Sequence, residues 1–330
     1  MPGQILNWHP NKGNKMNTKL IVAFAFSLLA GTAHTKDLTV GMSNIGLSYA
    51  YGSALNQGVV DAGAAAGVKI ISLDARTDVS KQANDIDDLV SQKVDGIIAI
   101  PGDSAIAESW ANRIDAAGIP FISVSGQVGN PATRKLEDIY PSILAFVAHN
   151  DITSGSLAAE IALPFLPKDR PAKIVVIEGA PGYDNVVKRS AGFERKLTEA
   201  GIKYEIVASQ PGDWVVEKGE EACQNILPAQ PEIDVIFAQS DDMAVGCSRA
   251  TRGAGREIPI VSIDGNNLGL AAVAAGQVAG TVCNRPYDMG KKAFETMHAF
   301  LTGEKKEKAQ LVILDTPIIR KENVGDCAGH

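Results

Sequence analysis

Apolar runs and helical patterns alternate along the chain from residue 37 onward. Runs such as "LTVGM", "GIIAI" and "FISVS" are apolar throughout, which is typical of parallel strands buried on both faces of a sheet. Between these runs, residues 78–93 place Ala83, Ile86, Leu89 and Val90 on one face of a helix. The same reasoning predicts strands at 37–43, 68–75, 96–100 and 121–125, and helices at 51–66, 78–93 and 104–117.

An irregular stretch at 126–143 separates this first block from a second block of the same kind. Two successive blocks of alternating strand and helix predict an α/β protein with two similar open lobes, each containing a parallel sheet. In the second block we predict strands at 144–150, 172–179, 204–211, 234–239, 258–265, 280–284 and 311–319, and helices at 152–165, 185–199, 215–227, 241–253, 267–275 and 287–302.

Polar and aromatic residues follow the predicted strands, where open parallel sheets bind their ligands. Carboxylates and amides hydrogen-bond sugar hydroxyls, and aromatic rings cover the C–H faces of a sugar, so this set favours carbohydrate binding. The strand-end residues are Tyr49, Tyr51, Asp103, Ser125, Asn150, Asp151, Tyr183, Asp184, Asn185, Trp214, Ser240, Asp241, Asp264, Asn266, Asn284 and Arg285.

Several of these residues also have a purely structural interpretation. Tyr51 fits the core side of the first helix, and Trp214 fits packing within a lobe. Asp264 is harder to explain in this way, because a carboxylate that ends the apolar strand "IPIVSI" needs partners or a cleft. We therefore place Asp264 in the ligand site.

The glycines of "GMSNIGLSYAYGSALNQG" raise the alternative of a phosphate loop. Gly41 lies within the strand, and Gly46 is followed by "LSYAYG", so the spacing does not fit GxGxxG, and the chain has no GxxxxGK[ST]. Nucleotide binding by either motif is excluded.

Catalytic motifs are also missing from the sequence, which has no GxSxG and no HExxH. Asp241 and Asp242 could form an acid pair, but adjacent acids at a helix start more often cap the helix. His149 ends a strand without a recognisable partner. We expect no enzyme and no cofactor.

Composition and the N-terminus narrow the class further. The 330 residues carry a formal charge of −7 without a basic stripe, which argues against nucleic acid. Lys19, an apolar segment at 20–30 and small residues near Ala33 and Thr35 predict a signal peptide within residues 1–35, with residues 1–15 as an upstream extension. No other stretch is apolar enough to span a membrane, so we expect a soluble exported protein.

Export permits disulfides among Cys223, Cys247, Cys283 and Cys327, and four cysteines allow three pairings. Small buried thiols are the alternative. Metal binding is not expected, because there is no CxxC and the five histidines are scattered.

Long ordered segments closely resemble the ribose-type periplasmic sugar-binding proteins of ABC importers. They include "DGIIAIPGDSAIAESWANRIDAAGIPFISV", "ASQPGDW", "NILPAQPEIDVIFAQSDDMAVGCSRA" and "IVSIDG", and the resemblance covers about residues 37–320. It implies two lobes that close around a monosaccharide and a monomer in the periplasm. The partners it implies are a permease in the inner membrane and a chemoreceptor that also binds the closed form. The implied lobes are 36–149 with 286–315 and 150–285 with 316–330, joined by hinge strands near 149–151, 284–286 and 315–316.

The resemblance also assigns site residues by position. The binding aspartate falls on Asp264, the amide after the next strand on Asn284 and the aromatic of "QPGDW" on Trp214, while Ser240 stands where the family usually has Asn. With the strand-end residues, the expected ligand set is Tyr49, Tyr51, Ser125, Asn185, Trp214, Ser240, Asp264 and Asn284. On the lobe layout we favour the disulfides Cys223–Cys247 and Cys283–Cys327.

Departures from the family pattern bear on the ligand. Gly52, Ser125, Gly126 and Val187 replace an aromatic, an aspartate and two arginines, and Arg189 is expected to face elsewhere. Lost hydrogen-bonding partners change specificity strongly, and lost bulk predicts a wider cleft. A hexose, a substituted sugar or a polyol is therefore favoured over ribose. The alternative is a quorum-signal furanone or a nucleoside, while a sugar-responsive repressor is excluded because residues 1–36 offer no DNA-binding module.

Overall fold

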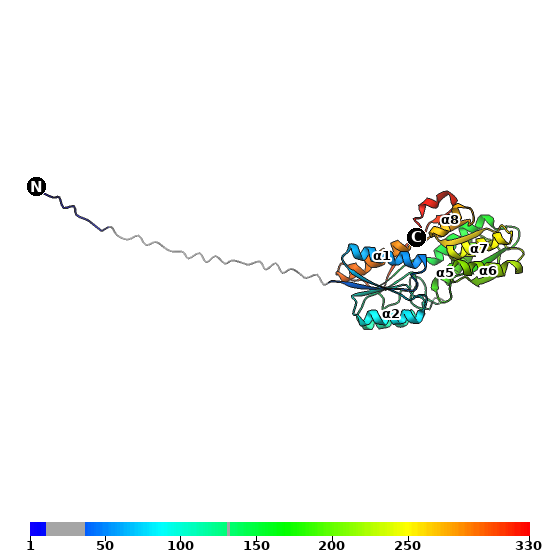
Figure 1. The fold of residues 1–330 in the computed structure, drawn as a ribbon, viewed down its shortest axis with the longest axis horizontal. Helices are drawn as coiled ribbons and strands as arrows, with labels where there is room; N and C mark the ends of the chain where they lie inside the picture. The colour runs from blue at the N-terminus through cyan, green and yellow to red at the C-terminus, as the bar shows by residue number, and fades with distance from the viewer. Residues whose placement is uncertain (11–36, 131–132) are drawn as a thin grey trace. The chain divides into compact units, whose positions relative to one another are not determined.

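The computed structural model describes residues 1–10, 37–130 and 133–330 (Figure 1). Most of the predicted signal peptide, from residue 11 onward, lies outside the described residues. Within the part that the structure describes, no helix has both the length and the apolar character to cross a membrane.

The first lobe contains a six-stranded parallel sheet in the order β11-β5-β4-β3-β1-β2. Val40 and Met42 face one layer of helices, and Ile97 and Ala99 face the other. The strands are β1 (Thr39–Asn44), β2 (Lys69–Asp74), β3 (Gly96–Ala99), β4 (Phe121–Val124), β5 (Ala145–His149) and β11 (Gln310–Leu314). Helices α1 (Ala50–Ala65) and α9 (Pro286–Leu301) cover one face, and α2 (Val79–Ser91) and α3 (Ala107–Ala116) cover the other.

The second lobe repeats this arrangement with the order β12-β10-β9-β8-β6-β7. Its strands are β6 (Ala172–Glu178), β7 (Tyr204–Pro211), β8 (Val235–Ala238), β9 (Ile260–Asp264), β10 (Gly280–Cys283) and β12 (Ile318–Ile319), of which β12 is antiparallel. Helices α4 (Asp151–Ala162) and α5 (Asp184–Glu199) cover one face; α6 (Val216–Ala229), α7 (Asp241–Gly253) and α8 (Asn267–Ala274) cover the other. Two 3₁₀ helices complete the lobe, η1 (Leu163–Phe165) and η2 (Lys321–Asp326).

The prediction of two parallel-sheet lobes is thus confirmed, with one strand predicted wrongly. The run 311–319 is divided into β11 of the first sheet and β12 of the second. Pro317 between them has no N–H to donate to a ladder, and its carbonyl accepts a hydrogen bond from the Cys283 backbone instead. A continuous apolar pattern therefore did not reveal that the chain changes sheet.

Within the described residues, the chain passes between the sheets three times, after His149, after Cys283 and after Leu314. Both favoured disulfides are present in the structure. Cys223 of α6 is bonded to Cys247 of α7, and Cys283 at the end of β10 is bonded to Cys327 after η2.

Candidate ligand site

A cavity of about 160 Å³ lies between the strand ends of the two lobes. Seven of the eight predicted ligand residues line it: Tyr49, Tyr51, Ser125, Asn185, Trp214, Ser240 and Asp264. Asn284 does not line the cavity. It lies behind Asp264 and donates a hydrogen bond from Nδ2 to Asp264 Oδ1 at 2.9 Å.

The wall from the first lobe is neutral. Tyr49 precedes α1 and Tyr51 lies in its first turn. The Tyr51 hydroxyl is 3.1 Å from Ser125 Oγ, and burial raises the pKa of this phenol. Ser125 itself has φ of 66° in the loop after β4, which non-glycine residues seldom adopt. Tyr51 is therefore both a cavity residue and a residue packed against the first-lobe core.

Gly52 has a different role from the one predicted. A Cβ at this position would lie 2.4 Å from the carbonyl oxygen of Gly46 and 2.9 Å from Asn44 Oδ1. The Asn44 side chain also donates to the Gly52 carbonyl at 2.8 Å and accepts from Gly46 N at 2.9 Å. Glycine is thus required for close approach of the loop to α1, and its small size does not by itself widen the cleft.

The wall from the second lobe carries charge. Asp264 ends β9, is only 7% exposed, and lies 3.6 Å from the Arg189 guanidinium. Burial raises the pKa of Asp264 well above its ordinary value; Arg189 opposes the rise, and the neighbouring Asp241 and Asp242 add to it. A carboxylate in these surroundings gains from every hydrogen-bond donor that a ligand brings.

The prediction that Arg189 faces away from the ligand site is wrong. Arg189 lines the cavity, donates from Nε to Asp151 Oδ1 at 2.8 Å and lies with its guanidinium carbon 5.7 Å from the Trp214 ring centre. Val187, two residues earlier on α5, is 47% exposed, because a shift of two positions turns a helix by about 200°. The position that lost its arginine is therefore on the outer side of the helix.

Trp214 is held between Tyr183 and Gly179. Its ring meets Tyr183 edge to face at 5.8 Å, and a Cβ at Gly179 would lie 1.8 Å from the indole. Asp213 and Trp214 both have positive φ, 52° and 67°, so a strained turn directs the ring. The packing interpretation and the ligand interpretation of Trp214 are both compatible with this position.

Asp241 and Asp242 do not form an acid pair. Asp241 accepts hydrogen bonds from Ser262, Thr281 and the backbone of Asn266, and burial raises its pKa to about 6. Asp242 lines the cavity and accepts from Asn266 Nδ2 at 2.6 Å. Asp241 thus supports the turn after β9, whereas Asp242 faces the site.

Among the cavity residues missing from the predicted ligand set, four have aromatic, charged or amide side chains: Tyr183, Arg189, Asp242 and Asn266. Tyr183 and Asn266 follow strands, so the strand-end rule had identified them. Asp242 was interpreted as part of a helix cap. Arg189 was missed because the direction of its side chain depends on the rotation of α5 about its axis, which no local sequence pattern gives.

His149 lies where the chain first leaves the first lobe. Its Nε2 accepts from the Arg285 backbone at 3.2 Å, at the second passage between the sheets. Burial lowers the pKa of His149 to about 3, and the cations Arg189 and Arg285 and the imidazole of His330 act in the same direction. A neutral histidine therefore joins two of the connecting segments.

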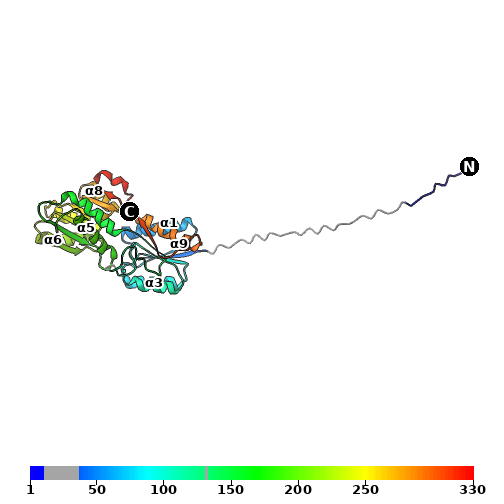
Figure 2. The same ribbon diagram turned by 180° about the vertical axis from the view of Figure 1, so that it is seen from behind.

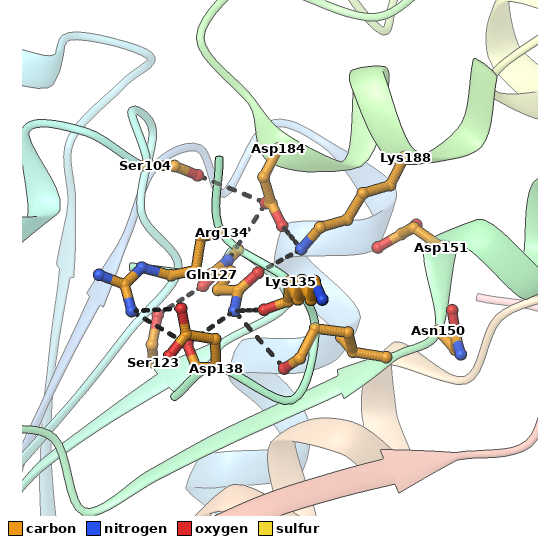
Figure 3. A network of polar contacts seen from close by, with 12 residues as sticks. Ser104, Ser123, Gln127, Arg134, Lys135, Asp138, Asn150, Asp151, Asp184 and Lys188 are labelled. Carbon is orange, nitrogen blue, oxygen red and sulfur yellow. Dashed lines mark hydrogen bonds and ion pairs between the residues drawn. The ribbon is translucent and has the colours of Figure 1, made fainter. Parts of the chain in front are cut away.

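A buried polar network links the two lobes beside the cavity (Figure 3). Lys188 of α5 donates to Asp184 Oδ2 at 2.6 Å and to Gln127 Oε1 of the first lobe at 2.5 Å. Asp184 Oδ1 accepts from the backbone of Gln127 at 3.1 Å and from Ser104 at 3.4 Å. Gln127 is fixed in turn by the carbonyls of Lys135 and Asp138. The lobes are thus connected by a buried ion pair whose two members both bond to Gln127.

Among the described residues, no group of three or more histidine, cysteine, aspartate or glutamate side chains could hold a metal ion. The cavity lining combines hydrogen-bonding groups and aromatic rings with aliphatic residues such as Ile45, Ile100 and Val215.

Residues 40–305 match the family model described as a periplasmic binding protein domain. The ribose import binding protein of Bacillus subtilis is 29% identical over 279 residues, 84% of this chain and 87% of the relative. A putative rhizopine-binding protein of Rhizobium meliloti is 29% identical over 316 residues, 94% of this chain and 99% of the relative. A Mycobacterium smegmatis structure in complex with β-D-fucofuranose superposes with a TM-score of 0.78 at 26% identity, covering 88% of this chain and 93% of that one.

Proposed function

This chain belongs to the periplasmic binding protein domain family, and we propose that it is the solute-binding component of an ABC importer. In this proposal it captures a monosaccharide or a sugar-like polyol in the periplasm and delivers it to the membrane permease. The single observation that carries the proposal is the interlobe cavity, lined by four aromatic rings and buried carboxylate, guanidinium and amide groups.

The chemistry of the lining suits a polyhydroxylated ligand. Asp264 and Asp242 accept hydrogen bonds, Arg189 donates them, and Tyr49, Tyr51 and Trp214 offer apolar ring surface. Within the described part of the chain, Asn185 Oδ1 is buried and has no protein partner, although Asn185 lines the cavity. A ligand hydroxyl would satisfy this acceptor.

Binding proceeds without covalent chemistry. The lobes, 36–149 with 286–315 and 150–285 with 316–330, move about the three connecting segments, and a ligand that contacts both walls favours the closed form by that differential affinity. The permease binds the surface that closure creates, and a chemoreceptor also binds this surface. The protein is a monomer, exported by a cleaved signal peptide within residues 1–35.

The preferred class of ligand follows from hydrogen-bonding side chains that the first lobe lacks. Ser125 and Gly126 stand where ribose binders carry aspartate and arginine, and a site that loses such partners discriminates against the original ligand. Since Gly52 is required by packing, this argument rests on the lost hydrogen bonds and not on a wider cleft. A hexose, a substituted sugar or a polyol is the preferred class.

A thermal-unfolding panel tests the proposal, with D-ribose, D-galactose, xylitol, myo-inositol and adenosine as probes. A ligand at 100 times its Kd stabilises the folded state by about 2.7 kcal/mol, so one sugar or polyol should raise Tm by several degrees. Asp264→Asn should reduce that shift to about half or less at the same ligand concentration. Preferential stabilisation by adenosine would support the nucleoside alternative, and ribose as the best stabiliser would refute the preferred class.

A further inference from the structure

Residues 327–330 run from the second lobe to the first beside the ligand cavity. The C-terminal end of the chain lies between α8 and α1 in both views (Figures 1 and 2). Cys327 is fixed to Cys283 by a disulfide with a Cα–Cα distance of 6.0 Å. Cys283 immediately precedes Asn284, whose side chain donates to Asp264. The covalent anchor is therefore one residue from the support of the buried carboxylate.

The disulfide also lies against the turn that presents Asp264. A Cβ at Gly265 would be 2.6 Å from Cys327 Sγ and 2.9 Å from Cys283 Cα, and the carbonyl oxygen of Gly265 is 3.4 Å from Cys327 Sγ. Gly265 has φ of 71°, so glycine suits this position for its backbone and for its size. The backbone of the Asp264–Gly265 turn is thus packed directly on the disulfide.

The other end of the segment reaches the opposite wall. The backbone of His330 accepts a hydrogen bond from Asn267 N at 3.2 Å, at the start of α8 in the second lobe. Its imidazole meets the Tyr51 ring of the first lobe edge to face, with centroids 5.9 Å apart and planes at 79°. Neither ring nitrogen of His330 has a hydrogen-bond partner among the described residues, so this side chain acts by packing.

We infer that residues 327–330 form a positioning strap for the ligand cavity, in which the Cys283–Cys327 disulfide supports the Asp264 turn and His330 supports Tyr51. The inference rests on the proposed function, since it assigns these residues a role in ligand affinity. Neither Cys327 nor His330 lines the cavity, so both are positioning residues. Loss of the strap loosens one side chain on each wall of the site.

The chain offers a matched control. The Cys223–Cys247 disulfide joins α6 to α7 within the core of the second lobe, and neither cysteine lines the cavity. The two disulfides close loops of comparable length, with sequence separations of 24 and 44 residues, so their removal costs comparable loop entropy. A difference in ligand affinity between the two double variants is then a property of position.

Calorimetry on the full chain tests the strap, with the most stabilising sugar of the panel above as the probe. His330→Ala should weaken its binding roughly 2- to 10-fold through loss of the aromatic pair. His330→Phe, which keeps a ring, should restore binding to within about 2-fold. The Cys283→Ala/Cys327→Ala variant should lose about 10-fold or more in affinity, whereas Cys223→Ala/Cys247→Ala should lose stability with an unchanged Kd. Wild-type affinity in His330→Ala would overturn the inference even if the cysteine variant failed to fold.

Hydrogen exchange separates failure of the strap from failure of the proposed function. Without any ligand, His330→Ala should accelerate exchange about 5-fold or more at 46–53 and 264–269, compared with wild type and with His330→Phe. If no sugar binds the wild type but this local change occurs, the strap stands and the ligand class is wrong. Unchanged exchange in both segments would refute the strap.

Discussion

The two walls of the cavity differ in how they are made. The first-lobe wall is neutral and combines rings and hydroxyls with apolar residues, and its Tyr51–Ser125 contact lies within that lobe. The second-lobe wall consists of Asp264, Arg189 and their partners, all held within the second lobe. The charged wall therefore holds its groups in place without help from the first lobe, whereas Tyr51 of the neutral wall also packs against His330 of the second lobe. The Gln127–Lys188 network is the contrasting case, because its partners come from both lobes.

The largest loss of folding stability is expected at the buried Asp184–Lys188 ion pair, which connects the two lobes through Gln127. Lys188→Met leaves Asp184 buried and unpaired, since these side chains are only 6% and 1% exposed. Breaking a buried pair in this way costs about 3–5 kcal/mol of folding free energy, measurable by urea unfolding. The combined variant Asp184→Asn/Lys188→Met should recover most of the loss. Lys218→Met, at an exposed pair with Glu221, should leave the midpoint unchanged; an equal loss there would contradict the assignment.

The charged wall should dominate ligand affinity. Asp264→Asn keeps the size of the side chain and removes hydrogen bonds to a charged group, each worth about 1.5–3 kcal/mol, so Kd should rise roughly 10- to 150-fold. Calorimetry with the panel sugar measures this. Asp61→Asn, on the outer side of α1 where Asp61 bonds to Gln57 and Tyr287, is the matched control and should bind normally.

Lowering the pH should change folding stability in opposite directions through the connecting segments and through the charged wall. The pKa of His149 is lowered to about 3 in the folded state, so the unfolded chain takes up its proton near pH 6.5 and stability falls as the pH drops below that value. The raised pKa values of Asp264 and Asp241 act in the opposite direction, since their contribution to stability falls as the pH rises.

Subtracting the stability of His149→Gln from that of the wild type removes the contribution of the carboxylates, because both proteins contain them. Between pH 7 and pH 5 the wild type should lose about 2 kcal/mol relative to the variant, as urea midpoints at each pH would show. Parallel pH profiles would mean that His149 titrates normally in the folded protein.

The smallest effect is expected at the neutral wall. Tyr51→Phe removes the hydroxyl contact with Ser125 and keeps the ring, so affinity should fall by about 0.5–1.5 kcal/mol, roughly 2- to 10-fold in Kd. Tyr140→Phe removes a comparable hydrogen bond to Asn112 away from the cavity and should leave Kd unchanged. A loss at Tyr51 larger than that at Asp264 would reverse the ranking of the two walls.

The fold was predictable because parallel strands buried on both faces have continuous apolar sequences, and helices cover them in regular order. Strand ends identified most of the cavity for the same reason. Arg189 was not predictable, because its direction depends on the rotation of α5 about its axis. Gly52 was misinterpreted because a glycine can reflect open space or close packing, and only the position of Gly46 distinguishes the two. The Asp184–Lys188 pair had a visible signal in its i,i+4 spacing on α5, but the spacing does not reveal Gln127 as its third member.

The three passages between the sheets have a consequence for the order in which the molecule can form. Tyr287 of α9 donates to Asp61 of α1 across 226 residues, and β11 completes the edge of the first sheet beside β5. During synthesis, the first lobe therefore lacks a covering helix and an edge strand until nearly the whole second lobe has been made. Contacts so distant in sequence form slowly. The half of the protein that is translated first is the half that must wait longest to be finished.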